Sequence, residues 1–388
     1  MGRWRRPAEL RLSWTCAGKE DTRTMDHGLG LLLSCFFIVF SSLFIFSEAQ
    51  LAPALFMFGD SLVDVGNNNH LKLSLAKADF PHNGVDFPGK KPTGRFCNGK
   101  NAADFLAEKL GLPSAPPYLS LISKSKSSNE SFVAGVSFAS GGAGIFDGTD
   151  ALYKQSLPLK KQVDYYATVY ERLVQQLGSA GAQEHLSKSV FAVVIGSNDI
   201  LGYYGSDSST RNKTTPQQFV DSMAATLKEQ LKRMYNLGAR KFAMVGVGAV
   251  GCCPSQRNKN STEECSEEAN YWSVKYNERL KSLLQELISE LKGMSYSYFD
   301  TYSVMLNLIQ KPAAYGFKEV KAACCGLGNL NADFPCLPIS TYCSNRKDHV
   351  FWDLYHPTEA AASIVVQHIF NGTQEYTFPV NLRQLVAA

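Results

Sequence analysis

Residues 54–66 read ALFMFGDSLVDVG, an apolar run that ends in Gly59, Asp60 and Ser61. The run Ala54–Phe58 has the continuous apolar character of a strand that is buried on both faces. A glycine, a carboxylate and a hydroxyl directly after such a strand can close it as an ordinary turn. They can equally open a reactive site in which the serine is a nucleophile. The rest of the sequence has to decide between these two interpretations.

The chain continues as an alternation of strand-like and helix-like segments. Further buried strands are predicted at Val190–Ile195, Phe242–Val247 and, less clearly, Tyr296–Phe299. Helical periodicity is found in the segments between and after them, which are Lys160–Leu177, Thr215–Leu237, Ser266–Leu291 and Pro357–Phe370. Apolar strands that alternate with amphipathic helices predict an α/β protein with a parallel sheet covered on both faces. The Ser-rich residues 120–131 and the polar residues 205–213 are expected to be surface loops.

Composition places the chain among ordinary globular proteins. It has 388 residues, of which 45% are hydrophobic and 19% are charged. The net charge is +4, from 39 basic and 35 acidic side chains of interspersed sign. This balance gives no argument for nucleic acid or an acidic membrane surface as a partner.

The N-terminus has the layout of a secretory signal peptide. Residues 29–46, LGLLLSCFFIVFSSLFIF, carry no charge, basic residues precede them, and small residues allow cleavage after Ala49. A membrane anchor is the alternative, since the run approaches the length of a spanning helix. Met25 is a possible true start. We therefore expect residues 1–49 to be an N-terminal extension and signal peptide, and residues 50–388 to be a single secreted domain.

Two further features agree with secretion. Glycosylation triplets occur in polar contexts at Asn129, Asn212, Asn260 and Asn371. Eight cysteines remain after residue 49, and an even number in a secreted chain favours disulfide bonds. Two pairs are vicinal, so each member is expected to bond elsewhere, with connectivity left open. A zinc site is a weak alternative, because no C-x-x-C spacing occurs.

Polar residues gather where the predicted strands end. Ser61 follows the first strand, and the tetrapeptide Gly196–Asp199 follows the second. Ligands of open α/β sheets bind at this edge. A hydrolytic serine needs a histidine base that a carboxylate orients. His356 stands three residues after Asp353 and just before Pro357, which is expected to start the last helix. Local sequence leaves open whether this pair is catalytic or is a capped turn at a helix start.

Acyl transfer also requires donors for a developing oxyanion. The glycines of residues 137–144 could let backbone N–H groups approach a ligand closely. A phosphate-binding loop is the alternative, but this segment lacks the lysine and the spacing of such a loop. Asn198 could donate from its side-chain amide, although it could also be an ordinary turn asparagine.

These blocks, in this order, resemble a known family. FGDSLVDVGNN, FASGGAG, GSND and Asp353-x-x-His356-Pro357 are similar to the GDSL esterase/lipase family of the SGNH-hydrolase superfamily, in its secreted plant branch. TGRFCNG at 93–99, the glycines and Cys252 of 246–254, and ACCG at 323–326 extend the resemblance over residues 54–370. One departure is Ser137, where this branch usually has asparagine.

The resemblance implies a three-layer α/β/α sandwich with a flavodoxin-like parallel sheet. It implies that Ser61 is the nucleophile, that His356 is the general base and then acid, and that Asp353 orients His356. The expected oxyanion donors are the backbone of Ser61, Gly141 and Asn198. No metal or organic cofactor is implied. Asp60 receives no catalytic role and is expected to hydrogen-bond backbone N–H groups of its turn.

The predicted function is therefore a secreted serine carboxylester hydrolase that acts on lipid or other acyl esters. Acyl transfer to a sugar or a cutin-type alcohol would use the same residues. A catalytically silent lipid- or carbohydrate-binding relative is the non-enzymatic alternative, and a metal phosphoesterase that uses Asp60, Asp353 and His356 has too few clustered ligands. The loops 80–91 and 201–212 are expected to wall the site.

Overall fold

In the computed structural model, which describes residues 50–124, 132–149, 151–206 and 214–388, five strands form the central sheet. In sheet order they are β1 (Leu55–Gly59), β2 (Val190–Val194), β3 (Lys241–Val245), β4 (Ser295–Phe299) and β9 (Thr377–Phe378). Strands β1 to β4 pair in parallel, and β9 is antiparallel to β4. The four predicted strands are confirmed to within one or two residues at their ends, and the short antiparallel edge strand is an addition to them.

A sixth segment lies along the free edge of β1. The amide of Met57 donates to the carbonyl of Val136 at 2.9 Å, and the amide of Phe138 donates to Met57 at 2.8 Å. Met57 and Ser137 thus form a parallel bridge. Counting this segment as the second element gives the order 2-1-3-4-5, which is the flavodoxin-like order. The predicted α/β/α fold class is confirmed.

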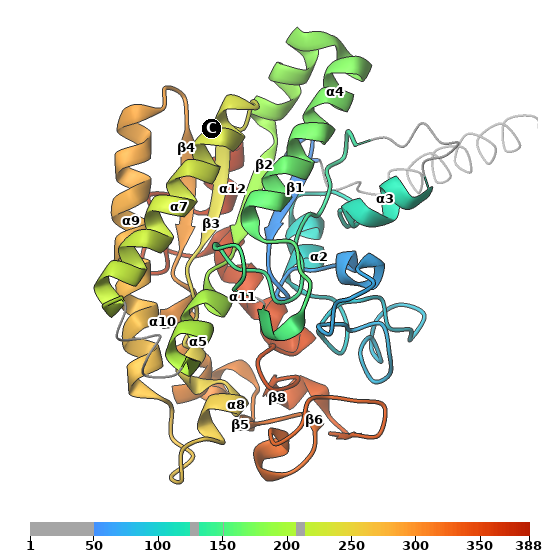
Figure 1. The fold of residues 1–388 in the computed structure, drawn as a ribbon, viewed down its shortest axis with the longest axis vertical. Helices are drawn as coiled ribbons and strands as arrows, with labels where there is room; N and C mark the ends of the chain where they lie inside the picture. The colour runs from blue at the N-terminus through green and yellow to red at the C-terminus, as the bar shows by residue number, and fades with distance from the viewer. Residues whose placement is uncertain (1–49, 125–131, 150, 207–213) are drawn as a thin grey trace, which may run out of the picture. The chain divides into compact units, whose positions relative to one another are not determined.

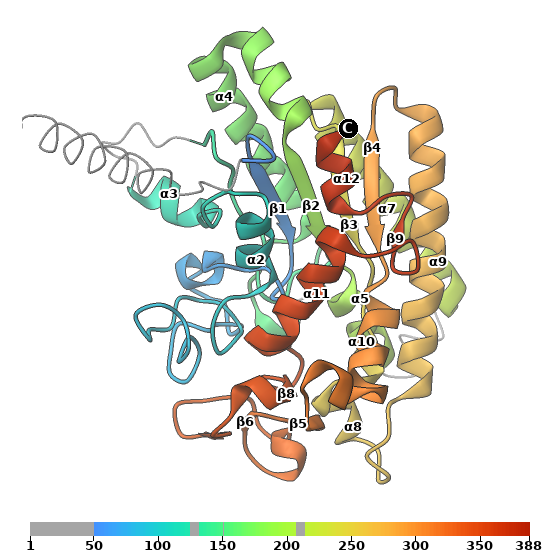
Figure 2. The same cartoon turned by 180° about the vertical axis from the view of Figure 1, so that it is seen from behind.

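Helices cover both faces of the sheet (Figures 1 and 2). Side chains of alternating strand residues point to opposite faces, so Phe56 and Phe58 belong to one core while Leu55 and Met57 belong to the other. The first core is closed by α4 (Leu159–Lys188), α7 (Pro216–Asn236) and α9 (Glu267–Glu290). The second is closed by α2 (Ala102–Lys109), α10 (Thr301–Gln310), α11 (Glu359–Asn371) and α12 (Leu382–Ala387).

Capping residues fix where the predicted helices begin. Thr215 caps α7 and forms a reciprocal box with Gln218, as the Thr-Pro start predicts. The last helix differs from expectation, because Thr358 caps α11 and its first residue is Glu359. Pro357 instead pairs with Phe351 in an isolated bridge, so it holds the loop that precedes the helix rather than opening it.

The remaining elements are short and lie mostly at the carboxyl edge of the sheet. Residues 120–124, expected to be a loop, belong to α3 (Tyr118–Lys124). The other short helices and strands are α5 (Ser197–Gly205), α8 (Pro254–Arg257), β5 (Glu319–Ala323), β6 (Cys325–Gly326), β7 (Thr341–Tyr342) and β8 (His349–Phe351). The 3-10 turns are Asn67–His70, Ala151–Tyr153, Val250–Cys252, Pro312–Tyr315, Asn329–Asn331 and Arg346–Asp348.

Disulfide bonds are present in the second half of the chain. Within the described residues they join Cys252 to Cys265, Cys324 to Cys343, and Cys325 to Cys336. Both members of the vicinal pair at 324–325 bond elsewhere, as expected. The expectation is wrong for Cys253, which is a buried free thiol, as is Cys97.

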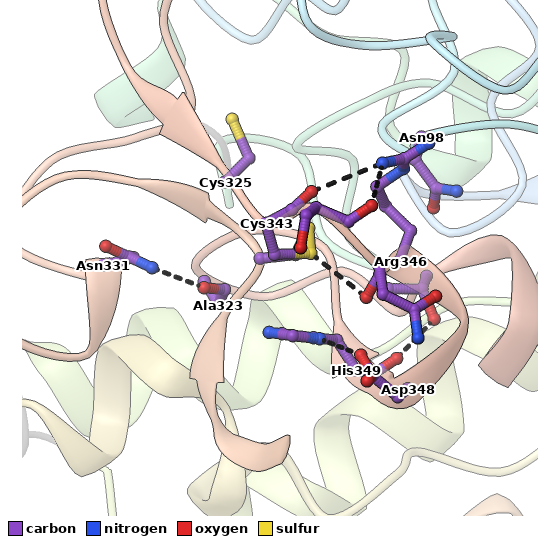
Figure 3. The surroundings of a disulfide bond; sticks show 12 residues. Asn98, Ala323, Cys325, Asn331, Cys343, Arg346, Asp348 and His349 are labelled. Carbon is purple, nitrogen blue, oxygen red and sulfur yellow. Dashed lines mark hydrogen bonds and ion pairs between the residues drawn. A yellow bond between two sulfur atoms is a disulfide. The ribbon is translucent and has the colours of Figure 1, made fainter. Parts of the chain in front are cut away.

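Polar contacts reinforce the small disulfide-bonded region around Cys343 (Figure 3). The side-chain amide of Asn331 donates to the carbonyl oxygen of Ala323 at 2.8 Å. Arg346 contacts the carbonyl oxygen of Cys343 and forms an ion pair with Asp86, which lies far away in the sequence. These contacts join the disulfide region to the loop that carries Asp86.

The described residues belong to one compact unit, Gln50–Ala388. The expected signal peptide lies outside the described residues. Of the helices that the structure describes, none is both long and apolar enough to cross a bilayer.

Candidate active site

The turn after β1 depends on close packing against β2. A Cβ atom on Gly59 would overlap the carbonyl oxygen of Val194, so only glycine fits there. Gln162 of α4 holds the same residue from the other side, because its side chain accepts from the Gly59 amide at 2.9 Å and donates to the Gly59 carbonyl at 2.8 Å. The strand end that precedes Ser61 is therefore fixed from both sides.

Asp60 shapes the turn that presents Ser61. Its amide donates to Val194 at 3.1 Å, and its Oδ1 atom accepts from the amide of Leu62 at 3.0 Å. The expected hydrogen bond to the turn is thus confirmed. The Oδ2 atom is buried without a partner among the described residues. Burial raises the pKa of Asp60 to about 7, although the Leu62 amide and the nearby His356 act in the opposite direction.

The structure brings Ser61, His356 and Asp353 into direct contact. Nε2 of His356 lies 2.7 Å from Oγ of Ser61, across 295 residues of sequence. Nδ1 of the same imidazole lies 2.7 Å and 2.9 Å from the two carboxylate oxygens of Asp353. A carboxylate beside Nδ1 favours the tautomer that carries its proton there, which leaves Nε2 free to accept the serine proton.

Asp353 is held in its ionised form. Burial raises the pKa of this carboxyl, but the charge of His356 and the hydrogen bonds around it outweigh burial and bring the pKa below its ordinary value. Its Oδ1 atom also accepts from the amides of Tyr355 at 3.0 Å and His356 at 2.9 Å. Asp353 therefore closes its own tight turn, and this is the capped-turn geometry that the local sequence also allowed.

The loop that carries His356 is closed by one internal hydrogen bond and contacts two neighbouring segments. The Trp352 amide donates to the His356 carbonyl at 2.7 Å, and the amide of Ser255 in α8 donates to Leu354 at 3.1 Å. The ring of Phe96 lies against the imidazole with 5.1 Å between ring centroids. Both His356 and Asp353 are only 9% exposed, so the imidazole is positioned by packing as well as by hydrogen bonds.

The glycine-rich loop differs from expectation at Gly141. The amide N–H of Gly141 donates to Oδ2 of Asp64 at 3.0 Å, and this residue does not line the cavity at Ser61. The next residue, Gly142, lines that cavity, has a positive φ of 81°, and its amide has no partner in the described part of the chain. Gly142, rather than Gly141, thus lines the cavity that Ser61 also lines.

Asn198 follows β2, as expected, and is the second residue of α5 on the cavity wall. One N–H of its side-chain amide donates to the carbonyl of Ala143 at 2.9 Å, which fixes the orientation of the group and leaves the second N–H available. The neighbouring Asp199 accepts from the amides of Ile145 and Phe146 at 2.9 Å and 3.2 Å. The GSND segment therefore anchors the glycine-rich loop.

Sequence reasoning missed the buried polar residues that follow the serine. Asp64 accepts from the amides of Gly66 at 2.7 Å and Asn67 at 2.8 Å, in addition to Gly141. Burial raises its pKa to about 6. Asn68 donates to the carbonyls of Ala76 and Gly141, each at 2.8 Å. The polar run DVGNN directly after the first motif was the available signal for this network.

A cavity of about 850 Å³ contains Ser61, Asp353 and His356. This volume is within the range of small-molecule sites. Both segments that were expected to wall the site line this cavity. Residues 80–91 contribute Phe80 and Asn83, and residues 201–212 contribute Leu201 and Gly202. The second segment is the helix α5 as far as Gly205, rather than a loop.

Among the described residues, the other positions that stand out in the sequence do not line this cavity. Asn260 is partly exposed and Asn371, the last residue of α11, is exposed, while Asn129 and Asn212 lie outside the described residues. His349 forms a separate pair with Asp348, with 2.8 Å between Nδ1 and Oδ1 (Figure 3). Ser137, the departure from the usual asparagine, is buried and its hydroxyl has no partner among the described residues.

Comparisons with known proteins identify the family of this chain. The sequence model of the GDSL-like lipase/acylhydrolase family matches residues 55–369. One GDSL esterase/lipase from Arabidopsis thaliana is 54% identical over 340 residues, which are 86% of this chain and 90% of the relative. Two others from the same plant are 40% and 41% identical over 325 and 349 residues, with 84% and 87% of this chain covered and 90% and 92% of the relatives.

Among solved structures, a catalytic mutant of an acetylxylan esterase from Geobacillus stearothermophilus matches with a TM-score of 0.34 and 12% identity. The match covers 81% of this chain and 91% of the esterase. The family match and the plant relatives extend over nearly all of residues 50–388, and the chain belongs to the GDSL-like lipase/acylhydrolase family.

Proposed function

We propose that this protein is a secreted serine carboxylester hydrolase that works through an acyl-enzyme on Ser61. The observation that carries the proposal is the 2.7 Å contact between Oγ of Ser61 and Nε2 of His356, in line with Asp353 on the other side of the ring. A serine hydroxyl is a weak nucleophile at neutral pH and needs such a base. Membership of the lipase/acylhydrolase family supports the same reaction class.

In the first half of the reaction, Oγ of Ser61 attacks the ester carbonyl carbon as its proton passes to Nε2 of His356. The imidazolium that forms is stabilised by Asp353, which remains a carboxylate. The tetrahedral carbon then expels the alcohol, whose oxygen takes the proton back from Nε2. The product that remains is an acyl ester of Ser61.

In the second half, a water molecule takes the place of the alcohol. His356 accepts a proton from this water as it attacks the acyl carbonyl, and the collapse of the second tetrahedral species returns the proton to Oγ of Ser61. The carboxylic acid leaves and the enzyme is restored. Every proton moves between groups that are within hydrogen-bond reach of His356.

The negative oxygen of both tetrahedral species requires fixed donors. We assign this role to the amide of Ser61, the amide of Gly142 and the side chain of Asn198. The first two amides have no partner in the described residues, and Asn198 retains one N–H. Gly142 replaces Gly141 in this assignment because Asp64 already occupies the Gly141 amide.

Secretion is part of the proposal. Three disulfide bonds favour an oxidising compartment, in which such bonds persist. Cleavage after Ala49 would leave Gln50 at the start of the mature chain, next to the first strand. Sequencing the N-terminus of protein collected from the culture medium of an expressing eukaryotic cell tests this; a mature protein that starts before the apolar run would contradict it.

The experiment that tests the activity compares two serine variants. Ser61 and Ser197 both line the cavity, but His356 contacts only the first. Ser61→Ala should abolish hydrolysis of p-nitrophenyl esters while leaving the thermal unfolding curve unchanged. Ser197→Ala should retain most of the turnover. Ester hydrolysis that survives in folded Ser61→Ala contradicts the proposal.

A further inference from the structure

The cavity at Ser61 continues into the interior of the protein. Its inner wall consists of side chains from the second core, between the sheet and the helices α10 and α11, and they are Val194, Val245, Met305, Phe351, Val365 and Ile369. In Figure 2, α11 lies in front of the sheet and α10 lies below β4. We call this part of the cavity the inner arm. It is a cavity whose wall is formed by residues of a hydrophobic core.

The side chains of the inner arm are almost wholly buried. Val194 and Val245 are each 7% exposed and Val365 is 9% exposed, although all three are core residues. Phe351 and Ile369 are 1% and 3% exposed. An apolar ligand in the inner arm would cover the apolar surface of these side chains that water can still reach. Removal of apolar surface from water favours the binding of hydrocarbon.

The helix α11 gives the inner arm its direction and length. It begins at Glu359, three residues after His356, and its wall residues Ala362, Val365 and Ile369 lie on one face at helical spacing. Seven residues of α-helix extend over about 10 Å. The inner arm therefore leads away from His356 along an extended apolar wall, which fits a straight hydrocarbon chain better than a compact or polar group.

The opposite part of the cavity is its mouth. Leu75 and Leu152 line it and are 63% and 80% exposed, so this side opens to water. In the proposed reaction the alcohol leaves first, while the acyl group stays bonded to Ser61, and water must then enter. An alcohol held in the inner arm would have to pass the acyl group. An acyl chain in the inner arm leaves the mouth free for both the alcohol and the water.

From this geometry we infer that the inner arm binds the acyl chain of the substrate, and that the protein selects esters of medium- and long-chain fatty acids. This inference rests on the acyl-enzyme proposed above. Each methylene that enters the inner arm should raise kcat/KM by up to about fourfold until the arm is full. Val365 on α11 and Met305 on α10 line the inner arm from its two helices.

The test uses p-nitrophenyl acetate, butanoate, octanoate and hexadecanoate with the full secreted chain. Val365→Phe fills the inner arm from α11, and Met305→Trp fills it from α10. The matched control is Ile364→Phe, since Ile364 is partly buried on the same helix and does not line the cavity. Thermal unfolding curves identify which variants are folded. Val365→Phe and Met305→Trp are the two arm variants, and one of them in folded form is enough for the test.

We expect the arm variants to lose at least tenfold in kcat/KM on octanoate and hexadecanoate, with acetate within twofold of wild type. Ile364→Phe should keep the wild-type order of substrates. Equal losses of kcat/KM on all four esters in both arm variants would overturn the inference. It would also be overturned if, in a series of alkyl acetates, the loss of kcat/KM in the arm variants grew with the length of the alcohol. Absence of turnover on every ester by the wild type would instead overturn the proposed function and this inference with it.

Discussion

Oδ2 of Asp64 accepts a hydrogen bond from the amide of Gly141 at 3.0 Å, and this contact reassigns a residue of the proposed site. Gly141 stands in the position that the family resemblance offers as an oxyanion donor. Its amide is instead used to hold the glycine-rich loop on the polar residues that follow the nucleophile. The next amide, that of Gly142, is left on the cavity wall.

Asp64 is therefore expected to act as a positioning residue. The backbone amides of Gly66, Asn67 and Gly141 all donate to the carboxylate of Asp64. Asp64→Asn removes the negative charge and places an amide N–H against one of these donors. We expect kcat on a short ester to fall by roughly tenfold or more, because one oxyanion donor is displaced. KM should change little, since the inner arm is intact. A folded variant with wild-type kcat would show that the loop does not depend on this carboxylate.

The chain offers a matched control for the proposed base. His356 pairs with Asp353 at the cavity, and His349 pairs with Asp348 away from it, with nearly equal distances of 2.7 Å and 2.8 Å. His356→Ala should lower kcat/KM by about 10³-fold or more, because Ser61 loses its proton acceptor. His349→Ala should leave kcat/KM within twofold. Equal losses in the two variants would assign the effect to folding rather than to catalysis.

Asp60 gives a pH-dependent prediction for stability. Burial raises its pKa from 3.8 to about 7, so the ionised form is disfavoured in the folded state. A folded-state pKa above the unfolded value means that stability is fully present below about pH 4 and is lost as the pH rises towards about pH 7. Asp60→Asn does not ionise and escapes this loss.

The comparison of the two proteins isolates this carboxyl. Between about pH 5 and about pH 8, the free energy of unfolding of Asp60→Asn should rise relative to wild type by roughly 2–3 kcal/mol. Urea unfolding at the two pH values measures it. Asp64, whose pKa is also raised, is present in both proteins and cancels. A difference that does not change with pH would mean that folding does not raise the pKa of Asp60.

The thiols of Cys97 and Cys253, the free cysteines of the part of the chain that the structure describes, should be inert in the folded protein. Burial raises the pKa of Cys253 to about 12 and that of Cys97 further still, so neither forms a thiolate at neutral pH. Without reductant, we expect iodoacetamide to leave both unmodified in the native mature chain and to modify both in guanidinium. Peptide mapping should then recover the three disulfides. Rapid labelling of Cys253 in the native state would contradict its burial beside the loop that carries Tyr355 and His356.

Local sequence patterns predicted the strands and helices whose own residues specify them. The continuous apolar runs identified β1, β2 and β3, because a strand buried on both faces is mostly apolar, whereas β4 contains Ser297 and was predicted less clearly. The helix α7 was predicted from its Thr-Pro start, which specifies a cap by local chemistry alone. The edge strand β9 has two residues and leaves no such pattern.

The site was predicted in part and for a different reason. Ser61, Asp353, His356 and Asn198 stand in ordered motifs, so the resemblance could indicate each of them by position. The exchange of Gly141 for Gly142 depends on which of two adjacent amides meets Asp64, across 77 residues of sequence. The inner arm depends on packing between β2, β3, α10 and α11, and every residue in it would be an ordinary core residue in the sequence alone.

The central claim is that Ser61 forms a covalent intermediate, and labelling with a fluorophosphonate tests it most directly. This reagent phosphonylates a serine that a neighbouring histidine activates. The account predicts a single adduct on the intact protein, located by peptide mapping on Ser61, and absent in Ser61→Ala and greatly slowed in His356→Ala. An adduct on another residue, or an unlabelled wild-type protein that still hydrolyses esters, would contradict it.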